Sequence, residues 1–203
     1  MEEIADIAIE HDLAVISDEI YEDLIYDGEK HWSIASFKGM EDRTITLNGY
    51  SKAYAFTGWR LGYAAANPDF IEAMMKIHQY TQMCASTISQ YAALGAFELD
   101  DYVKDMVRSY DQRRKLLVKG LNGIPNVSCV IPKGAFYAFP SIKETGLSSQ
   151  KFAERLLKEG SVAVIPGDSF GACGEGYVRC AYCVSRDDIS EALNRIERFV
   201  KKL

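Results

Sequence analysis

Two isolated cations stand out in the stretch GYSKAYAFTGWRLGY, residues 49–63. Lys52 and Arg60 are its only charged residues, and the other positions carry small, hydroxylated or aromatic side chains. Keeping a lysine charged among apolar groups is costly, and the neutral amine is a nucleophile that attacks aldehydes. A lysine whose ammonium group reaches water past its apolar stem is the alternative. Lys52 taken alone favours that alternative.

Two arginines also lack an obvious acidic partner. Arg60 follows the tripeptide Thr-Gly-Trp, and we expect it to open a strand. A guanidinium group binds phosphate through two parallel hydrogen bonds, so Arg60 indicates an anionic ligand, with a cation–π contact to Trp59 or Tyr63 as the alternative. Arg179 stands in the middle of the apolar strand YVRCAYC, where a buried guanidinium needs a carboxylate from the protein or from a ligand.

Asp18 and Tyr21 come just after the apolar run 13–17, which is typical of a parallel strand covered on both faces. Lys52 follows the next short strand, 44–47, and ligands of α/β proteins bind where parallel strands end. We therefore expect all three side chains at one edge of a sheet. There a carboxylate can hold a protonated ring nitrogen and a phenol can bind a ring oxygen. A solvated acidic loop is the alternative explanation for SDEIYED.

The elements that must position these residues fall into two groups. The first group has a helix at 4–10, strands of parallel type at 13–17, 44–47 and 60–66, and a helical region from 69 to about 99 that breaks near 84–87. The second group has a long helix ending near Gly123, strands in VSCVI, AFYAFPSI, VAVIPG and YVRCAYCV, and helices at 149–159 and from Ser185 onward. We therefore predict an α/β protein with two domains, residues 1–100 and 101–203.

Composition excludes several classes of function. The net charge is −6 and no cluster of Lys and Arg occurs, which argues against nucleic acids and anionic membranes as partners. No apolar run reaches the roughly 18 residues that span a bilayer. The acidic, amphipathic N-terminus is unlike a secretory signal, and five cysteines without framework spacing indicate reduced thiols in the cytoplasm.

Cys180 and Cys183 form a C-x-x-C pair inside a predicted strand, where positions three apart point to opposite faces. No second pair of Cys or His lies nearby to complete a zinc site. We therefore expect structural roles for both thiols and no metal.

Five motifs taken together resemble the fold-type I enzymes that use pyridoxal 5'-phosphate (PLP), and most closely the class I/II aminotransferases of the aspartate aminotransferase type. They are SDEIYEDL, NGYSKAYAFTGWRLGYAAA, KGAFYAFP, PGDSFG and YVRCAYC. The resemblance covers essentially the whole chain, and S-K-x-x-x-x-T-G-W-R-x-G-Y is its most specific part. It implies the C-terminal part of that fold: a partial large-domain sheet in residues 1–100 and a small α/β domain in 101–203.

The resemblance also implies roles around the cofactor ring. Lys52 is expected to bind the PLP aldehyde and then to act as general base and acid. Asp18 is expected to keep the pyridine nitrogen protonated, which makes the ring an electron sink. Ile20 would pack on a face of the ring, and Tyr21 would hydrogen-bond its phenolic oxygen.

The resemblance also implies which residues bind the anionic groups of the cofactor and of the substrate. Arg60 is expected to bind the PLP phosphate, and Arg179 the α-carboxylate of the substrate. Many members of the family place a hydroxyl residue three positions before the lysine, where this chain has Gly49. We include Ser51, next to Lys52, as the residue that could take over this phosphate contact.

The function implied is a PLP-dependent amino-acid aminotransferase, which passes an amino group to a 2-oxo acid in amino-acid biosynthesis, as a cytoplasmic homodimer at full length. Relatives begin well upstream, with a phosphate-binding turn, a ring-stacking aromatic residue and an asparagine beside the tyrosine. We therefore expect this chain to be a C-terminal fragment that is inactive alone. Alternatives are a PLP lyase of the same fold, an aminotransferase-like effector domain of a transcription regulator, and a folding unit without catalysis.

Overall fold

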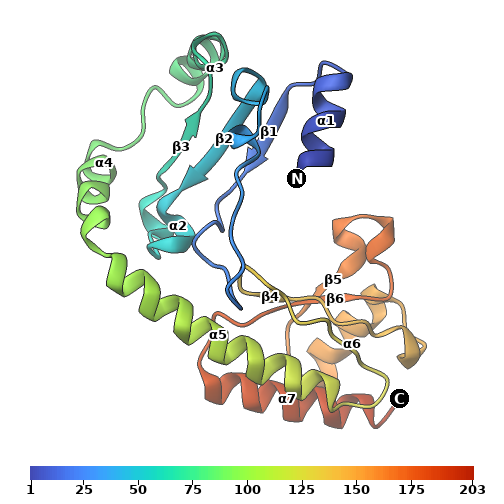
Figure 1. Ribbon diagram of the computed structural model, residues 1–203. Helices are drawn as coiled ribbons and strands as arrows, with labels where there is room; N and C mark the ends of the chain where they lie inside the picture. The colour runs from blue at the N-terminus through green and yellow to red at the C-terminus, as the bar shows by residue number, and fades with distance from the viewer. The chain divides into compact units, whose positions relative to one another are not determined.

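The computed structural model describes all 203 residues and divides them into two compact units, Met1–Lys104 and Asp105–Leu203. Each unit contains one three-stranded sheet together with helices (Figure 1). No helix combines the length and the apolar character that crossing a bilayer requires.

The sheet of the first unit has the order β1-β2-β3. β1 (Val15–Asp18) runs parallel to β2 (Thr44–Gly49), and β3 (Gly62–Ala65) runs antiparallel to β2. The prediction that all three strands are of parallel type is therefore wrong for β3. Residues 50–61 form a turn that reverses the chain at one end of the sheet, whereas a parallel pairing needs a crossover back to the other end.

Helices flank this sheet and lie at both of its ends. α1 (Glu2–Glu10) precedes β1, and the one-turn helix α2 (Tyr50–Ala53) follows β2. α3 (Pro68–Thr81) follows β3 at the opposite end of the sheet from α2 (Figure 1). The predicted break in the long helical region is confirmed, because α4 (Thr87–Leu94) begins only after residues 82–86.

A small core lies between α1 and the sheet. Ala5, Ala8, Ile34 and Met40 are buried there, and Val15 packs against them. On β1 the next residue, Ile16, points the other way and is 69% exposed. The prediction of a strand covered on both faces is therefore wrong for this chain, because only one face of β1 is covered.

The second unit has an antiparallel sheet in the order β4-β6-β5. Its strands are β4 (Tyr137–Ala138), β5 (Ile165–Pro166) and β6 (Val178–Ala181). The predicted strand VSCVI reduces to an isolated bridge between Ser128 and Ser141. Ser141 also bridges Tyr177, which lies just before β6.

Three helices accompany this sheet: α5 (Asp100–Asn122), whose residues from 105 onward belong to the second unit, α6 (Ser149–Gly160) and α7 (Arg186–Val200). The rings of Phe152 on α6 and Phe199 on α7 meet edge to face, 5.3 Å between centroids. The predicted cap of α7 is confirmed, because the Ser185 hydroxyl accepts the N–H of Asp188 (3.1 Å).

Candidate functional site

The carboxyl ends of the parallel strands β1 and β2 meet at one edge of the first sheet. Asp18, the last residue of β1, pairs with Leu47 of β2, and the N–H of Glu19 donates to the Leu47 carbonyl (2.8 Å). β2 ends at Gly49, and α2 carries Lys52 one turn later. Asp18 and Lys52 therefore lie at the same edge, on segments that leave neighbouring strands.

Lys52 is half-buried, and its Nζ atom lies 5.8 Å from the centroid of the Tyr21 ring. Tyr21 stands in a tight turn after β1, where the N–H of Leu24 donates to the Tyr21 carbonyl (2.9 Å). The Leu24 side chain is fully buried and anchors this turn. The amine and the phenol thus approach each other from two different strand ends.

Gly49 stands where β2 and β3 come closest. A Cβ atom at this position would lie 2.9 Å from the Gly62 Cα and 3.4 Å from the Ile20 Cδ1. A side chain here would push β3 away, which explains why no hydroxyl residue occupies the position three before the lysine. Ser51 is half-buried in α2, directly before Lys52.

Arg60 ends the 3₁₀ helix η3 (Thr57–Trp59) in the left-handed region, with φ 53° and ψ 47°. Such a backbone costs about 1–2 kcal/mol for a residue with a Cβ. The prediction that Arg60 opens a strand is therefore wrong: this turn must finish before the chain can pair with β2, and β3 begins only at Gly62. The buried Ser89 hydroxyl fixes the turn by donating to the Trp59 carbonyl (2.8 Å).

The Arg60 side chain is exposed, and its Nη1 donates to the carbonyl of Thr57 (2.8 Å). It forms no ion pair with a carboxylate of the chain and stacks on neither Trp59 nor Tyr63, which were the alternatives to an anionic ligand. A guanidinium held by one backbone carbonyl keeps most of its donors available to an anion.

Asp18 presents an exposed carboxylate at the end of β1. Its Oδ1 atom accepts the N–H of Ile20 (3.2 Å), a local contact that leaves the other oxygen available to a cationic group. Ile20 is half-buried beside Gly49. One short segment therefore offers an acceptor, an apolar side chain and a phenol in succession.

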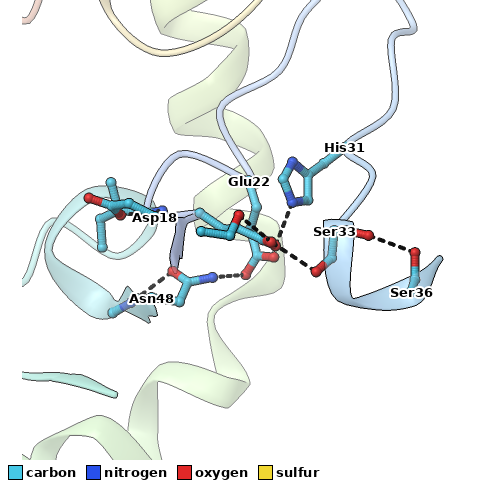
Figure 2. A network of polar contacts seen from close by, with 10 residues as sticks. Asp18, Glu22, His31, Ser33, Ser36 and Asn48 are labelled. Carbon is cyan, nitrogen blue, oxygen red and sulfur yellow. Dashed lines mark hydrogen bonds and ion pairs between the residues drawn. The ribbon is translucent and has the colours of Figure 1, made fainter. Parts of the chain in front are cut away.

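Glu19, which sequence analysis did not single out, is only 5% exposed. Its Oε1 accepts the hydroxyls of Ser17 (2.9 Å) and Ser33 (2.8 Å), and its Oε2 lies 2.7 Å from the His31 Nε2 (Figure 2). Burial raises the pKa of the Glu19 carboxyl, but hydrogen bonds from His31, Ser33 and Ser17 outweigh it, so the net pKa is lowered. The alternative explanation for SDEIYED, a solvated acidic loop, is therefore wrong at Glu19. The alternation of side chains along the strand puts residues 17 and 19 on one face, and this pattern could have indicated from the sequence that they lie together.

A second group missed from the sequence lines a pocket of about 310 Å³ beside α2, with Tyr50, Tyr54, Tyr63, Glu22 and Asp23 among its walls. Burial, together with the charge of Asp100, raises the pKa of Asp23. Burial likewise raises the pKa of Tyr54 and of Tyr63, with nearby carboxylates adding to the effect. Both phenols therefore stay neutral beside the lysine helix.

In the second unit, Arg179 is half-buried on β6 between two aromatic rings. Its Cζ atom lies 4.4 Å from the centroid of the Tyr137 ring and 4.7 Å from that of Phe170. Tyr137 belongs to β4 and Phe170 to the 3₁₀ helix η6 (Gly167–Phe170). Arg179 has no carboxylate partner in the chain, so the two rings orient the guanidinium while its N–H groups remain available to an anion.

The prediction that the C-x-x-C pair lies within one strand is wrong, because β6 ends at Ala181. Cys180 is buried on β6, whereas Cys183 lies beyond the strand and is exposed. Burial raises the pKa of the Cys180 thiol to about 12. The two thiols therefore differ in burial, and their structural role stays a prediction.

The family model for aminotransferase class I and II matches residues 1–196. The aspartate aminotransferase of Pyrococcus abyssi is 52% identical over 207 residues, and the aromatic-amino-acid aminotransferase 2 of Thermococcus litoralis is 49% identical over 207 residues. Each alignment covers 100% of this chain and 52% of the relative. The chain thus spans about half the length of the curated relatives it matches.

Solved structures agree with these relatives. An aromatic aminotransferase from Pyrococcus horikoshii superimposes with a TM-score of 0.96 at 52% identity, over 99% of this chain and 54% of that chain. The aspartate aminotransferase from Rhizobium meliloti gives a TM-score of 0.92 at 35% identity, over 98% of this chain and 52% of that chain. The predicted fold class is confirmed by these superpositions.

Proposed function

The chain belongs to the aminotransferase class I and II family, and from this premise we propose that the protein transfers the amino group of an amino acid to a 2-oxo acid with PLP as cofactor. One observation carries the proposal. Lys52 lies over the Tyr21 ring at the edge of the sheet where Asp18 ends β1. At this edge the Lys52 amine suits the PLP aldehyde, and the Tyr21 phenol suits the ring oxygen. The Asp18 carboxylate suits the ring nitrogen.

Enzymes of this family depend on PLP, and the residues present fit that group. Asp18 has an oxygen available for a protonated pyridine nitrogen, and Arg60 has guanidinium donors available for phosphate without a competing carboxylate. Gly49, which has no Cβ, lets β3 and the Ile20 side chain lie close to the end of β2, beside the helix that carries Lys52. We assign Asp18, Ile20, Tyr21, Ser51, Lys52 and Arg60 to cofactor binding.

When bound, PLP withdraws electrons from the α-carbon of the amino acid and so makes its proton acidic. We assign the proton transfer to Lys52, whose Nζ accepts this proton as general base and returns it as general acid. The Asp18 carboxylate holds the proton on the pyridine nitrogen by charge. The Tyr21 ring, 5.8 Å from the Lys52 Nζ, would help to orient the lysine amine.

We assign the α-carboxylate of the substrate to Arg179. The Pyrococcus abyssi and Thermococcus litoralis relatives are named for aspartate and for aromatic amino acids, and the α-carboxylate is the group that these substrates share. A guanidinium without a carboxylate partner, fixed between Tyr137 and Phe170, suits that common group. Selectivity for the side chain is then a property of other residues.

The finer parts of the proposal follow from the same premise. We assign residues 1–100 to the PLP-binding large domain and 101–203 to the small domain of this fold. We propose a homodimer that works in the cytoplasm in amino-acid biosynthesis, with small amino acids and 2-oxo acids as its ligands. The net charge of −6 fits small-molecule ligands rather than nucleic acids. The five free cysteines support a reducing compartment such as the cytoplasm.

A direct test maps the cofactor. Borohydride reduction of the whole protein after treatment with PLP, followed by peptide mass mapping, should leave the pyridoxyl mass on Lys52. Lys76 on α3 serves as an internal control lysine. A pyridoxyl group on another lysine, or on none, contradicts the assignment.

A second assay separates transfer from the alternatives. Incubation of the whole protein with ¹⁵N-labelled amino acids and unlabelled 2-oxo acids should move ¹⁵N into new amino acids. A PLP lyase would instead release ammonia or carbon dioxide without transferring ¹⁵N, and an effector domain of a regulator would bind PLP without turnover.

A further inference from the structure

A buried carboxylate supports the segment that carries three of the assigned residues. Glu19 lies between Asp18 and Ile20 and receives hydrogen bonds from Ser17, Ser33 and His31 (Figure 2). A buried charge is costly unless its oxygens are fully hydrogen-bonded, and both Glu19 oxygens have partners. Such a network holds one geometry and resists displacement.

The hydrogen bonds of Glu19 also fix the backbone of its neighbour Asp18. The Glu19 N–H donates to the Leu47 carbonyl (2.8 Å), while Asp18 itself is exposed and has only the contact from the Ile20 N–H (3.2 Å). The direction of the Asp18 carboxylate therefore depends on its backbone. That backbone is fixed one residue later, by the Glu19 side chain on one side and β2 on the other.

The other end of the network is anchored in the core of the first unit. Ser33 and His31 precede the 3₁₀ helix η1 (Ile34–Ser36), and the Ser36 hydroxyl donates to the Ser33 carbonyl (2.7 Å; Figure 2). Ile34 is buried in the α1 core. Glu19 thus links the Asp18 segment to a part of the chain that packing holds in place.

A metal site is the competing interpretation, because donor atoms of Glu19, Glu22 and His31 lie within 4.8 Å of one another. Those atoms are already engaged. The Glu19 Oε2 lies 2.7 Å from the His31 Nε2, and the Glu22 Oε1 accepts the Asn48 amide (2.5 Å). These contacts satisfy the donor atoms without a cation, which favours the hydrogen-bond network.

We propose that Glu19 is a positioning residue: its hydrogen bonds with Ser17, Ser33 and His31 fix the backbone that aims the Asp18 carboxylate at the PLP ring nitrogen. The inference rests on the proposed function, and it adds a residue that does not itself touch the cofactor. Because misplacement by about 1 Å can cost a hundredfold, a loosened Asp18 should be measurable.

The test is Glu19→Gln, which keeps the shape but removes the charge and one acceptor. We expect the dissociation constant for PLP to rise about tenfold and kcat to fall about tenfold or more, with KM for the amino acid nearly unchanged. ¹⁵N NMR of PLP labelled at the pyridine nitrogen should shift toward the unprotonated value. A purely structural role would not move this signal in a protein that is still folded.

Two control variants calibrate the result. Glu159→Gln makes the same substitution at an exposed carboxylate paired with Arg155, and Ser149→Ala removes a buried hydroxyl that accepts the Gly176 N–H (2.8 Å). Both should leave PLP binding and the ¹⁵N signal unchanged. If Glu19→Gln does not fold, Ser33→Ala removes a single donor and should shift both readouts in the same direction by a smaller amount.

Two failures are distinguishable. A wild-type protein that does not bind PLP at Lys52 overturns the proposed function. A wild-type protein that binds PLP there, with a Glu19→Gln variant whose ¹⁵N signal and PLP affinity are unchanged, overturns only the positioning role. A wild-type protein whose PLP affinity rises on adding Mg²⁺ or Zn²⁺, with no such rise in Glu19→Gln, would instead support the metal site and contradict the hydrogen-bond network.

Discussion

The Nζ atom of Lys52 lies 5.8 Å from the centre of the Tyr21 ring. The two residues are 31 positions apart in the sequence and follow two different strands, β1 and β2, whose parallel pairing brings their ends together. A cation and a ring at this separation attract each other weakly. The contact therefore places the lysine beside Tyr21, at the sheet edge where β1 ends at Asp18.

Substitutions at Tyr21 separate the role of its ring from that of its hydroxyl. Tyr21→Phe keeps the ring beside Lys52, and we expect PLP affinity to fall several-fold, as loss of one hydrogen bond of about 0.5–1.5 kcal/mol allows. Tyr21→Ala should lower affinity and kcat further, because the lysine loses its neighbour. Titration with PLP and steady-state kinetics measure both effects. Equal values for the two variants would contradict a role for the ring.

In the whole protein, Asp18→Ala should lower kcat by roughly a hundredfold or more, while PLP still attaches to Lys52. The reason is that the carboxylate acts on the ring nitrogen and not on the aldehyde. Single-turnover kinetics and pyridoxyl mapping check the two halves of this expectation. Asp12→Ala, at an exposed carboxylate paired with Arg43, is the control. Turnover near the wild-type rate would mean that Asp18 is simply solvated.

Arg179→Leu should raise KM for amino acids far more than it weakens PLP binding. Loss of a carboxylate clamp is worth about 2–5 kcal/mol, a factor of tens to thousands. Arg155→Leu is a matched control, because Arg155 also lies over a ring of the second unit, that of Phe199 (5.5 Å). An unfolded Arg179→Leu protein, with KM unchanged in Arg179→Lys, would make Arg179 a structural residue.

The two thiols of the C-x-x-C pair should react differently. Burial raises the pKa of the Cys180 thiol to about 12, so almost no thiolate exists at pH 8, whereas Cys183 is exposed. We expect iodoacetamide to label Cys183 and to spare Cys180 in the native protein, as peptide mass spectrometry can show. Equal labelling of both before unfolding would refute the burial of Cys180.

Stability at low pH should depend on Glu19. Hydrogen bonds hold its pKa below the ordinary value of 4.5 in spite of burial, so the charged form is the one that the fold stabilises. The contribution is present above about pH 4.5 and is lost as the pH falls through the lower, folded-state value. The difference in unfolding free energy between wild type and Glu19→Gln, about 1.5–3 kcal/mol at neutral pH, should therefore shrink below pH 4.5. Chemical denaturation at several pH values measures it, and a constant difference would show that the charge is irrelevant.

The sequence by itself determined the fold class and most of the elements. Apolar period and capping residues predicted β1, β2, the break between α3 and α4, and the start of α7 at the Ser185 cap. These signals are local, since each depends on residues within one or two turns of chain. The motif around Lys52 was equally local, and it indicated the family before any contact was known.

Tertiary structure alone decided the direction of β3 and the conformation of Arg60. Both depend on how residues 50–61 reverse the chain, which composition does not encode. It also decided that Glu19 is buried and that Arg179 lies between Tyr137 and Phe170. The partners of Glu19 beyond β1 are 12 and 14 residues away, and the rings around Arg179 come from β4 and η6. Such environments arise only when separate segments pack, because burial and hydrogen-bond partners are properties of the folded surface and not of a residue type.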